Sequence, residues 1–291
     1  MKQWRNPRLM LMASTAVFGT LGIFVRNIPV SSGELALYRA ILASLMIALY
    51  LTVSHQKIPF GAIRKEIPFL LLSGATMGIN WILLFEAYRY TTVSAATLSY
   101  YFAPVLVTVL CPFLFHEKMT PRQILCFVMS TSGLILITDA GGSGRGTDFI
   151  GILLGLCAAV FYAAVILLNK FIRNVEGLHR TFLQFIAAAA VLIPYVAVTG
   201  GVTLNRMTSA GWISLLIVGF FHTGLTYCMY FSSLSRLPGQ TAAVLSYIDP
   251  LVAVLVSVTV LHEPLSFRQA AGGALILGFT LLNELSPDAK Q

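Results

Sequence analysis

Charged residues are scarce in this chain of 291 residues, where Asp, Glu, Lys and Arg make up only 10%, against roughly 25% in soluble proteins. Hydrophobic residues make up 57%. So few charges cannot cover a water-soluble particle of this size, whereas a bilayer needs apolar stretches of about 20 residues with little charge between them. The composition excludes a soluble enzyme and predicts an all-α integral membrane protein.

Cysteine is also rare, and no metal-binding or redox spacing is present. The four cysteines lie singly in apolar stretches, as Cys111, Cys126, Cys157 and Cys228, which indicates neither a disulfide framework nor a metal site. Motifs such as HExxH, GxSxG and the phosphate-binding loop are absent as well. We therefore expect no cofactor, no metal, no ATP hydrolysis and no enzymatic activity.

What the sequence does contain is a series of apolar runs separated by charges and helix breakers, which predicts ten transmembrane helices. Their approximate ranges are 8–25, 34–53, 67–89, 93–114, 121–138, 149–170, 180–199, 209–235, 240–261 and 267–285. The loops between them are too short to hold a soluble domain.

Basic residues exceed acidic ones, giving a net charge of +8, and most of them stand in the loops. In a membrane protein this pattern reports topology rather than nucleic-acid binding, because Lys and Arg accumulate in cytoplasmic loops. Of the 19 basic residues, thirteen fall on one side of the predicted helices, five on the other, and Arg39 inside a helix. The count predicts cytoplasmic N- and C-termini.

The sequence repeats itself weakly at a distance of 146 residues, where residues 94–123 align with residues 240–269. The matches include Tyr101 with Tyr247, Pro104 with Pro250, His116–Glu117 with His262–Glu263, and Arg122–Gln123 with Arg268–Gln269. Two halves of five helices each have opposite orientations, as in the inverted repeats of many secondary transporters. We expect repeats over 1–140 and 148–291 joined by a Gly-rich linker over 141–147. An old duplication with a purely structural outcome is the alternative.

These residues resemble a known family. The segment from Phe85 to Glu117 and its copy from Phe231 to Gly272 are similar to the two repeats of EamA-type transporters in the drug/metabolite transporter superfamily, at positions Ala95, Ala96, Pro104, Ala242, Ala243, Pro250 and Glu263. The resemblance implies a ten-helix exporter or exchanger of small metabolites, often amino acids, in a plasma membrane. The chain departs from the family at His116 and His262, where glycine is usual, and at Glu86, where an uncharged residue is commoner.

Three charged residues fall inside predicted helices, where burying a charge costs about 2.5–3.5 kcal/mol and therefore points to a function. Two of them, Arg39 and Glu86, lie at compatible depths below the outer boundary. We expect them to form an ion pair that acts as an outer gate. The alternative is that both side chains reach the interface without a specific role.

The third, Asp249, is expected near the middle of the membrane, directly before Pro250, which interrupts the helix and frees a backbone carbonyl. An acid at such a break can bind a cation, the amino group of a zwitterion, or a proton. A structural acid paired with a neighbouring helix is the alternative. Ser246 shares its helical face, and Tyr101 and Tyr247 could form walls of the same cavity, although such aromatics also serve packing alone.

Further polar groups are expected at similar depths. Asn80 and Trp81 are candidate substrate contacts. His222 is a candidate proton-coupling partner of Asp249, because histidine titrates near physiological pH; the alternative is that it only hydrogen-bonds to a neighbouring helix. Glu117 and Glu263 end helices, and we expect each to cap the helix that follows in sequence, or else to act as a hinge.

Together these features predict a secondary active transporter that exports or exchanges a small amino-acid-like metabolite, zwitterionic or cationic, by alternating access. A proton or solute gradient would drive it. The expected partners are the substrate and the lipid bilayer, with no nucleic acid, and small-residue helix faces could support a homodimer. A channel is one alternative function and a membrane-embedded enzyme another. Saturable, gradient-coupled flux would distinguish a carrier from a channel.

Overall fold

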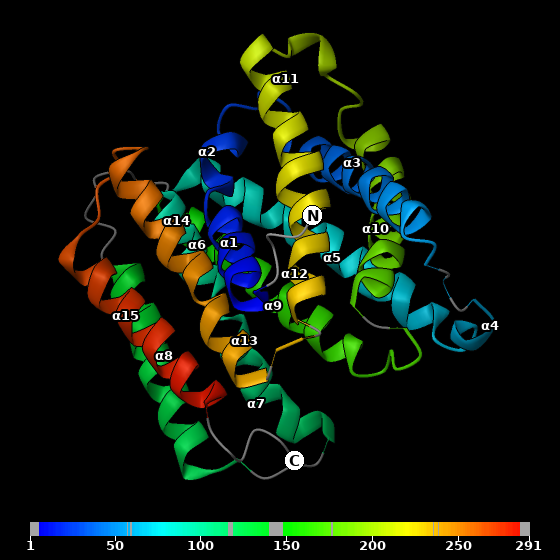
Figure 1. The fold of residues 1–291 in the computed structure, drawn as a ribbon. Helices are drawn as coiled ribbons and strands as arrows, with labels where there is room; N and C mark the ends of the chain where they lie inside the picture. Colours follow the sequence, from blue (N-terminus) through cyan, green and yellow to red (C-terminus); the bar gives the residue numbers. More distant parts are fainter. Residues whose placement is uncertain are drawn as a thin grey trace.

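The computed structural model describes residues 6–56, 58, 60–115, 119–139, 148–175, 177–234, 236–237 and 239–285. The predicted linker over 141–147 and the His116–Glu117 pair lie outside these residues. Within them every regular element is a helix, as the sequence predicts (Figure 1).

The helices follow the predicted ranges to within a few residues. The first half holds α1 (Pro7–Gly19), α2 (Leu21–Val25), α3 (Ser32–Val53), α4 (Phe60–Ile63), α5 (Ile67–Tyr90), α6 (Val93–Tyr100), α7 (Ala103–Phe115) and α8 (Pro121–Asp139). The second holds α9 (Asp148–Asn169), α10 (Gly177–Thr199), η1 (Leu204–Arg206), α11 (Ser209–Leu216), η2 (Ile217–Leu225), α12 (Thr226–Leu234), α13 (Gly239–Ser246), α14 (Ile248–Thr259) and α15 (Phe267–Glu284).

Seven helical stretches of the described chain are long and apolar enough to cross a membrane. They are Pro7–Val25, Ser32–Val53, Ile67–Tyr90, Val93–Leu110, Asp148–Asn169, Gly177–Thr199 and Ser209–Ser233. Two shorter apolar helices, Pro121–Ile137 and Val244–Thr259, accompany them. By length and composition, these helices suit a protein that crosses a membrane several times.

The fourth helix of each half is broken in the same way. Tyr101 separates α6 from α7 with φ −70° and ψ 4°, and Tyr247 separates α13 from α14 with φ −73° and ψ −7°. Each tyrosine stands three residues before a proline, Pro104 or Pro250. Because proline has no N–H to donate, each break leaves a backbone carbonyl available in the interior.

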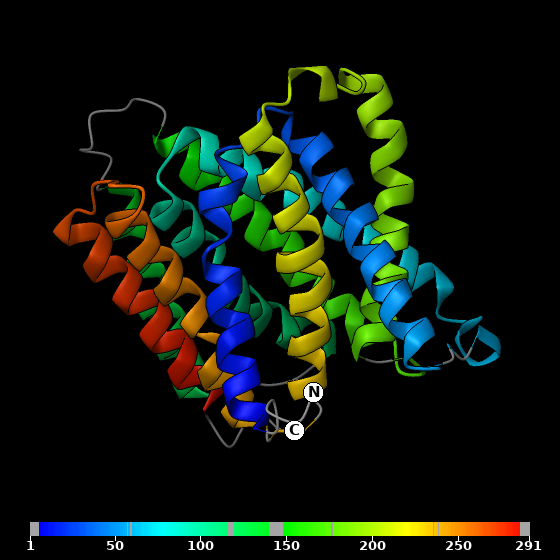
Figure 2. The same ribbon diagram turned by 45° about the horizontal axis from the view of Figure 1, so that its top comes forward.

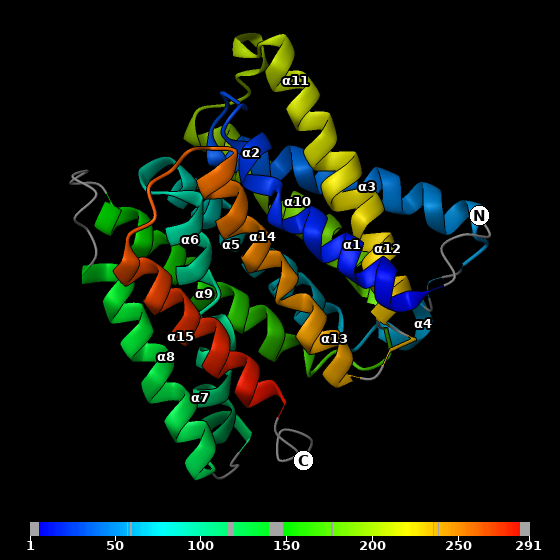
Figure 3. The same cartoon turned by 60° about the vertical axis from the view of Figure 1, so that its left-hand side comes forward.

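The two halves interlock rather than standing side by side. α1 packs on α12 as α9 packs on α5, and α3 packs on η2 as α10 packs on α5. The pairs α3 with α10 and α8 with α15 join equivalent helices of the two halves, and the last pair lies along one edge of the bundle (Figure 3). Exchanging the halves therefore maps these contacts onto one another.

Matching capping boxes start the last helix of each half. The Thr120 amide donates to Gln123 Oε1 at 2.8 Å and the Gln123 amide to Thr120 Oγ1 at 3.3 Å. The Ser266 amide likewise donates to Gln269 Oε1 at 3.0 Å and the Gln269 amide to Ser266 Oγ at 3.1 Å. These boxes satisfy backbone donors at each helix start, which explains why the glutamines match in the repeat.

The first described helix, α1, starts at the same end of the bundle at which the last one, α15, finishes. Figure 2 shows the beginning of α1, in blue, beside the end of α15, in red. The start of α11 and the loop before it lie at the opposite end. The two ends of the described chain are therefore on one side of the molecule.

Candidate functional site

Asp249 lies in the first turn of α14, next to the break at Tyr247. The Tyr101 hydroxyl donates to Asp249 Oδ2 at 2.6 Å, so the break of the first half contacts the acid of the second. The orphan amides at the start of α14 favour a negative charge there. Tyr101 and Asp249, two of the candidate substrate-binding residues, are thus in contact.

Gly19 allows α1 to lie directly against this acid. A Cβ atom at Gly19 would stand 2.5 Å from the Asp249 carbonyl oxygen and 2.7 Å from Val252 Cβ, closer than atoms approach one another. Only glycine fits without a shift of α1 or α14. The end of α1 therefore forms one side of the Asp249 site.

Aromatic rings from several helices lie near Tyr101 and the end of α1, which both contact Asp249. Tyr101 meets Tyr100 with ring centres 5.9 Å apart, and Tyr100 stacks on Tyr162 of α9 at 5.2 Å. Phe18 of α1, next to Gly19, lies 5.9 Å from Tyr230 of α12. Such rings offer faces that attract cations and hydroxyls that hydrogen-bond. The predicted site therefore has more aromatic groups than the two tyrosines of the repeat.

Arg39 is buried in the same interior, with 5% of its surface exposed. Its Nε donates to Thr223 Oγ1 of η2 at 2.8 Å. Its guanidinium carbon lies 4.6 Å from the ring centre of Trp81 and 5.5 Å from that of Phe85, which are cation–π contacts. Arg39 and Asp249 are within range of each other's charge, although the described residues show no ion-pair contact between them.

The predicted ion pair between Arg39 and Glu86 is not formed. Glu86 accepts a short hydrogen bond from the Ser32 hydroxyl, and Arg89 lies 3.5 Å from its carboxylate. Arg39 instead faces Trp81 and Phe85. Residues 81 and 85 share one face of α5, whereas residue 86 is turned about 100° away from residue 85, so depth alone could not pair the two charges.

A hollow of about 330 Å³ opens beside these residues, between α2 and the end of α5. We call it the α2–α5 hollow; its walls include Arg26, Ser32, Phe85, Tyr88 and Arg89. Phe85 both lines the hollow and lies against the Arg39 guanidinium. Pockets for small ligands have volumes of about 300 Å³ and above, so a small metabolite fits there.

The remaining predicted polar contacts, Asn80 and Ser246, are hydrogen-bonded to backbone carbonyls. Asn80 Nδ2 donates to the Ala158 carbonyl of α9 at 2.7 Å, and the Ser246 hydroxyl donates to the Ala242 carbonyl within its own helix at 2.8 Å. Both polar groups are therefore engaged by backbone. Trp81 is the exception among the α5 candidates, because it contacts Arg39.

His222 does not meet Asp249. Its Nε2 hydrogen-bonds with Thr20 Oγ1 at 2.8 Å, at the junction of α1 and α2, and its ring lies 4.9 Å from that of Phe24. The predicted relay between His222 and Asp249 is therefore not formed in this conformation. The alternative interpretation, a hydrogen bond to a neighbouring helix, describes the contact that is observed.

The π-helical turn η2 positions both His222 and Thr223. The Thr223 hydroxyl donates to the Val218 carbonyl, five residues earlier, at 2.8 Å, while its oxygen accepts from Arg39. π-Helical insertions rotate the residues that follow them and are frequent at functional sites. The sequence pattern contains no signal for this turn, because its apolar residues also fit an ordinary helix.

A second charged contact joins the halves at one end of the bundle. Arg26 forms a close ion pair with Glu263 and donates to the carbonyl oxygens of Tyr88 and Thr91 at 3.2 and 2.9 Å. The other carboxylate oxygen of Glu263 accepts from the Val93 amide at 2.8 Å. Glu263 therefore caps α6 of the first half, and the prediction that it caps the helix following it in sequence is wrong.

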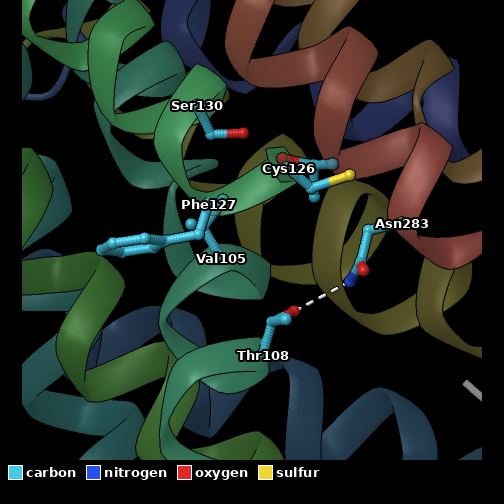
Figure 4. Close-up of a pocket in the computed structure, with 7 residues that line it drawn as sticks. Val105, Thr108, Cys126, Phe127, Ser130 and Asn283 are labelled. Carbon is cyan, nitrogen blue, oxygen red and sulfur yellow. Dashed lines mark hydrogen bonds between the residues drawn. The ribbon is translucent and has the colours of Figure 1, made fainter. Parts of the chain in front are cut away.

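A small pocket between α7, α8 and α15 belongs to packing (Figure 4). It has a volume of about 10 Å³, close to the minimum for one water molecule. Asn283 Nδ2 donates to Thr108 Oγ1 at 2.8 Å across it, while Ser130 Oγ and Asn283 Oδ1 have no protein partner in the described chain. A water molecule suits this pocket, and a metabolite does not.

Comparison with known proteins identifies the architecture. The sequence profile of the EamA-like transporter family matches the chain twice, over residues 7–139 and 149–284. The chain belongs to this family. EamA proteins are membrane transporters, which also confirms the expectation that the chain is not an enzyme.

Two curated relatives and one solved structure extend the comparison. The uncharacterized transporter YxxF of Bacillus subtilis is 29% identical over 256 residues, covering 87% of this chain and 81% of its own. A protein of Salmonella typhimurium named "Probable amino-acid metabolite efflux pump" is 25% identical over 251 residues, covering 80% and 82%. A crystal structure that is 16% identical shares the fold, with a TM-score of 0.66 over 94% of this chain and 95% of that one.

The backbone conformation at His262 explains why glycine is usual at this position of EamA proteins. His262 has φ 52°, a left-handed conformation that costs an L-residue about 1–2 kcal/mol and that glycine adopts freely. The turn directs Glu263 back toward Ser257, whose carbonyl accepts the Glu263 amide at 2.9 Å. Glycine at this position fits the geometry better than histidine does.

We predict that His262→Gly stabilises the protein. Relief of the left-handed backbone should exceed the entropy that glycine adds to the unfolded chain, for a net gain of about 0.5–1 kcal/mol. The measurement is the thermal unfolding midpoint of the purified protein in detergent. His262→Ala is the control, since it removes the imidazole and keeps the strain; a glycine variant no more stable than the alanine variant would contradict this explanation.

Proposed function

We propose that the protein exports or exchanges a small amino-acid-like metabolite, zwitterionic or cationic, with Asp249 binding its ammonium group. The single observation that carries this proposal is the acid at the start of α14, hydrogen-bonded by Tyr101 across the two halves. A carboxylate surrounded by tyrosine rings suits an ammonium group, which it attracts by charge while the rings attract it by their faces. The name of the Salmonella relative supports an amino-acid metabolite and the outward direction.

Alternating access is the mechanism we propose. Support comes from the contacts that map onto one another when the halves are exchanged, because an inverted repeat can form two equivalent gates around one site. In this scheme the chain crosses the plasma membrane ten times as two inverted five-helix repeats, with both termini in the cytoplasm. The α2–α5 hollow then faces outward.

A proton is the coupling ion we propose, carried by Asp249. The same carboxylate would bind either a proton or the substrate ammonium, so that one displaces the other. His222 has no part in this exchange while it is bound to Thr20. Since the chain contains no nucleotide-binding motif, a gradient must supply the energy.

The test is untargeted metabolite analysis of medium and cytosol from cells that express the protein, beside cells carrying an empty vector. We expect one or a few amine-bearing compounds to move from cytosol to medium. Each compound is then tested for counterflow in proteoliposomes, with and without a pH gradient. Saturable counterflow that responds to the pH gradient is the expected result; linear flux without counterflow would identify a channel and overturn the proposal.

A further inference from the structure

Arg39 is a buried cation whose hydrogen-bonding capacity is largely unused. Of its five N–H groups, the one on Nε donates to Thr223, and the two terminal nitrogens have no hydrogen bond or ion pair with any described residue. The side chain is 95% buried, its exposure being 5%. A charge inside a membrane protein is costly unless it is paired, so this guanidinium favours an anion.

The free edge of the guanidinium has the shape of a carboxylate receptor. Two parallel terminal N–H groups bind both oxygens of a carboxylate, which gives strength and fixes orientation. Thr223 accepts from Nε, and the rings of Trp81 and Phe85 lie 4.6 and 5.5 Å from the guanidinium carbon. The edge that carries the terminal nitrogens is therefore the part left for a ligand.

The charges of the interior limit the class of anion. Arg39 and Asp249 are one cation and one acid within range of each other without contact. A ligand with one carboxylate and one ammonium would neutralise both. A phosphate or sulfate would bring extra negative charge that Arg39 alone could not balance, next to a carboxylate that repels it.

The α2–α5 hollow lies next to the Arg39 side chain, with Phe85 common to both. Phe85 separates the hollow from the guanidinium, and Arg26 and Arg89 contribute positive charge to the walls. A displacement of the Phe85 ring would bring an anion in the hollow toward Arg39. The aromatic surroundings favour ligands with an apolar body.

We propose that Arg39 is the carboxylate-binding residue of the substrate site. This inference rests on the proposed function and narrows it, because the substrate must then bear a carboxylate and a purely cationic metabolite is excluded. Arg39 and Asp249 bind opposite ends of one zwitterion, and Arg39 is not part of a gate with Glu86.

Trp81 provides a direct readout of binding. The chain has three tryptophans, Trp4, Trp81 and Trp212, so Trp4→Phe and Trp212→Phe leave only the ring that stacks on Arg39. The purified protein is titrated with benzoate, and with benzamide as its uncharged analogue. We expect a saturable change in Trp81 fluorescence with benzoate and a response at least about tenfold weaker with benzamide.

Variants assign the response to Arg39. Arg39→Gln should weaken benzoate binding at least about tenfold, and Arg39→Lys should give an intermediate loss because it keeps charge without the fork. Arg64→Gln is the matched control, since it removes the same charge at an exposed position that does not line the α2–α5 hollow and should leave binding unchanged. If Arg39→Gln does not fold, Thr223→Val, which releases Nε, should weaken binding several-fold.

Two results would overturn the inference. The first is benzoate binding that is unchanged in Arg39→Gln or in a folded Thr223→Val. The second is the absence of a saturable response in a single-tryptophan protein that still exports its metabolite. In the second case the proposed function stands and the assignment of Arg39 fails. Benzoate binding that depends on Arg39 in a protein that moves no metabolite would instead support the carboxylate site and contradict the proposed function.

Discussion

Asp249→Asn should reduce substrate export about 100-fold at equal membrane abundance. Asparagine keeps the size and can still accept from Tyr101, but it loses the charge that binds an ammonium group and the site that binds a proton. A charge-assisted contact contributes about 1.5–3 kcal/mol, and about 2.8 kcal/mol corresponds to 100-fold. The measurement is the initial rate of counterflow of the identified metabolite in proteoliposomes.

Two companion variants calibrate this result. Tyr101→Phe removes one hydrogen bond to Asp249 and leaves the charge, so a loss of about fivefold is expected. Glu86→Gln changes an acid to an amide outside the Asp249 site, where the carboxylate contacts Ser32 and Arg89, and should retain near wild-type counterflow. Equal rates for Asp249→Asn and the wild type would remove Asp249 from the mechanism.

Glu263→Ala should destabilise the protein by about 3 kcal/mol or more, because it leaves the Val93 amide without its acceptor and Arg26 without its counter-ion. The carboxylate also accepts a hydrogen bond from the Ser257 hydroxyl, so three groups lose a common partner. We expect the thermal unfolding midpoint in detergent to fall by roughly 5–10 °C.

Replacing Glu263 with glutamine distinguishes the effect of the hydrogen bond to the Val93 amide from that of the ion pair with Arg26. Glu263→Gln keeps an oxygen for the Val93 amide while losing the ion pair, and should lie between the wild type and Glu263→Ala. Glu86→Ala is the matched control, because that side chain is 31% exposed and should change the midpoint little. A Glu263→Ala variant as stable as the wild type would show that the contact between the halves contributes nothing.

Features that depend on position along the chain could be predicted from the sequence. Apolar runs gave the helix ranges, and Pro250 located the break beside Asp249, because a missing N–H acts locally. The matching break before Pro104 was not predicted, although the repeat aligns the two prolines. The placement of Asp249 next to a break follows from the same local chemistry. Its contact with Tyr101 was within reach because both residues lie at the repeat-related break.

Features that depend on the rotation of one helix against another could not be predicted. Arg39 and Glu86 were paired by depth, but the face of α5 that meets Arg39 is set by Trp81 and Phe85. His222 is placed by a π-helical turn that has no pattern of its own. Glu263 reaches across to α6, so its role depends on the packing of the two halves and not on the helix that follows it in sequence.

The interlocking of the halves has a consequence for biogenesis. When the first half has left the ribosome, Arg39 has no Thr223 to accept its Nε–H and the Asn80 amide has no Ala158 carbonyl. Both groups therefore stay without these partners, in lipid or in the insertion machinery, until the helices of the second half are made. The first half alone therefore cannot satisfy its own buried polar groups. A chain truncated after the first half exposes these groups to cellular quality control, whereas the complete protein buries them.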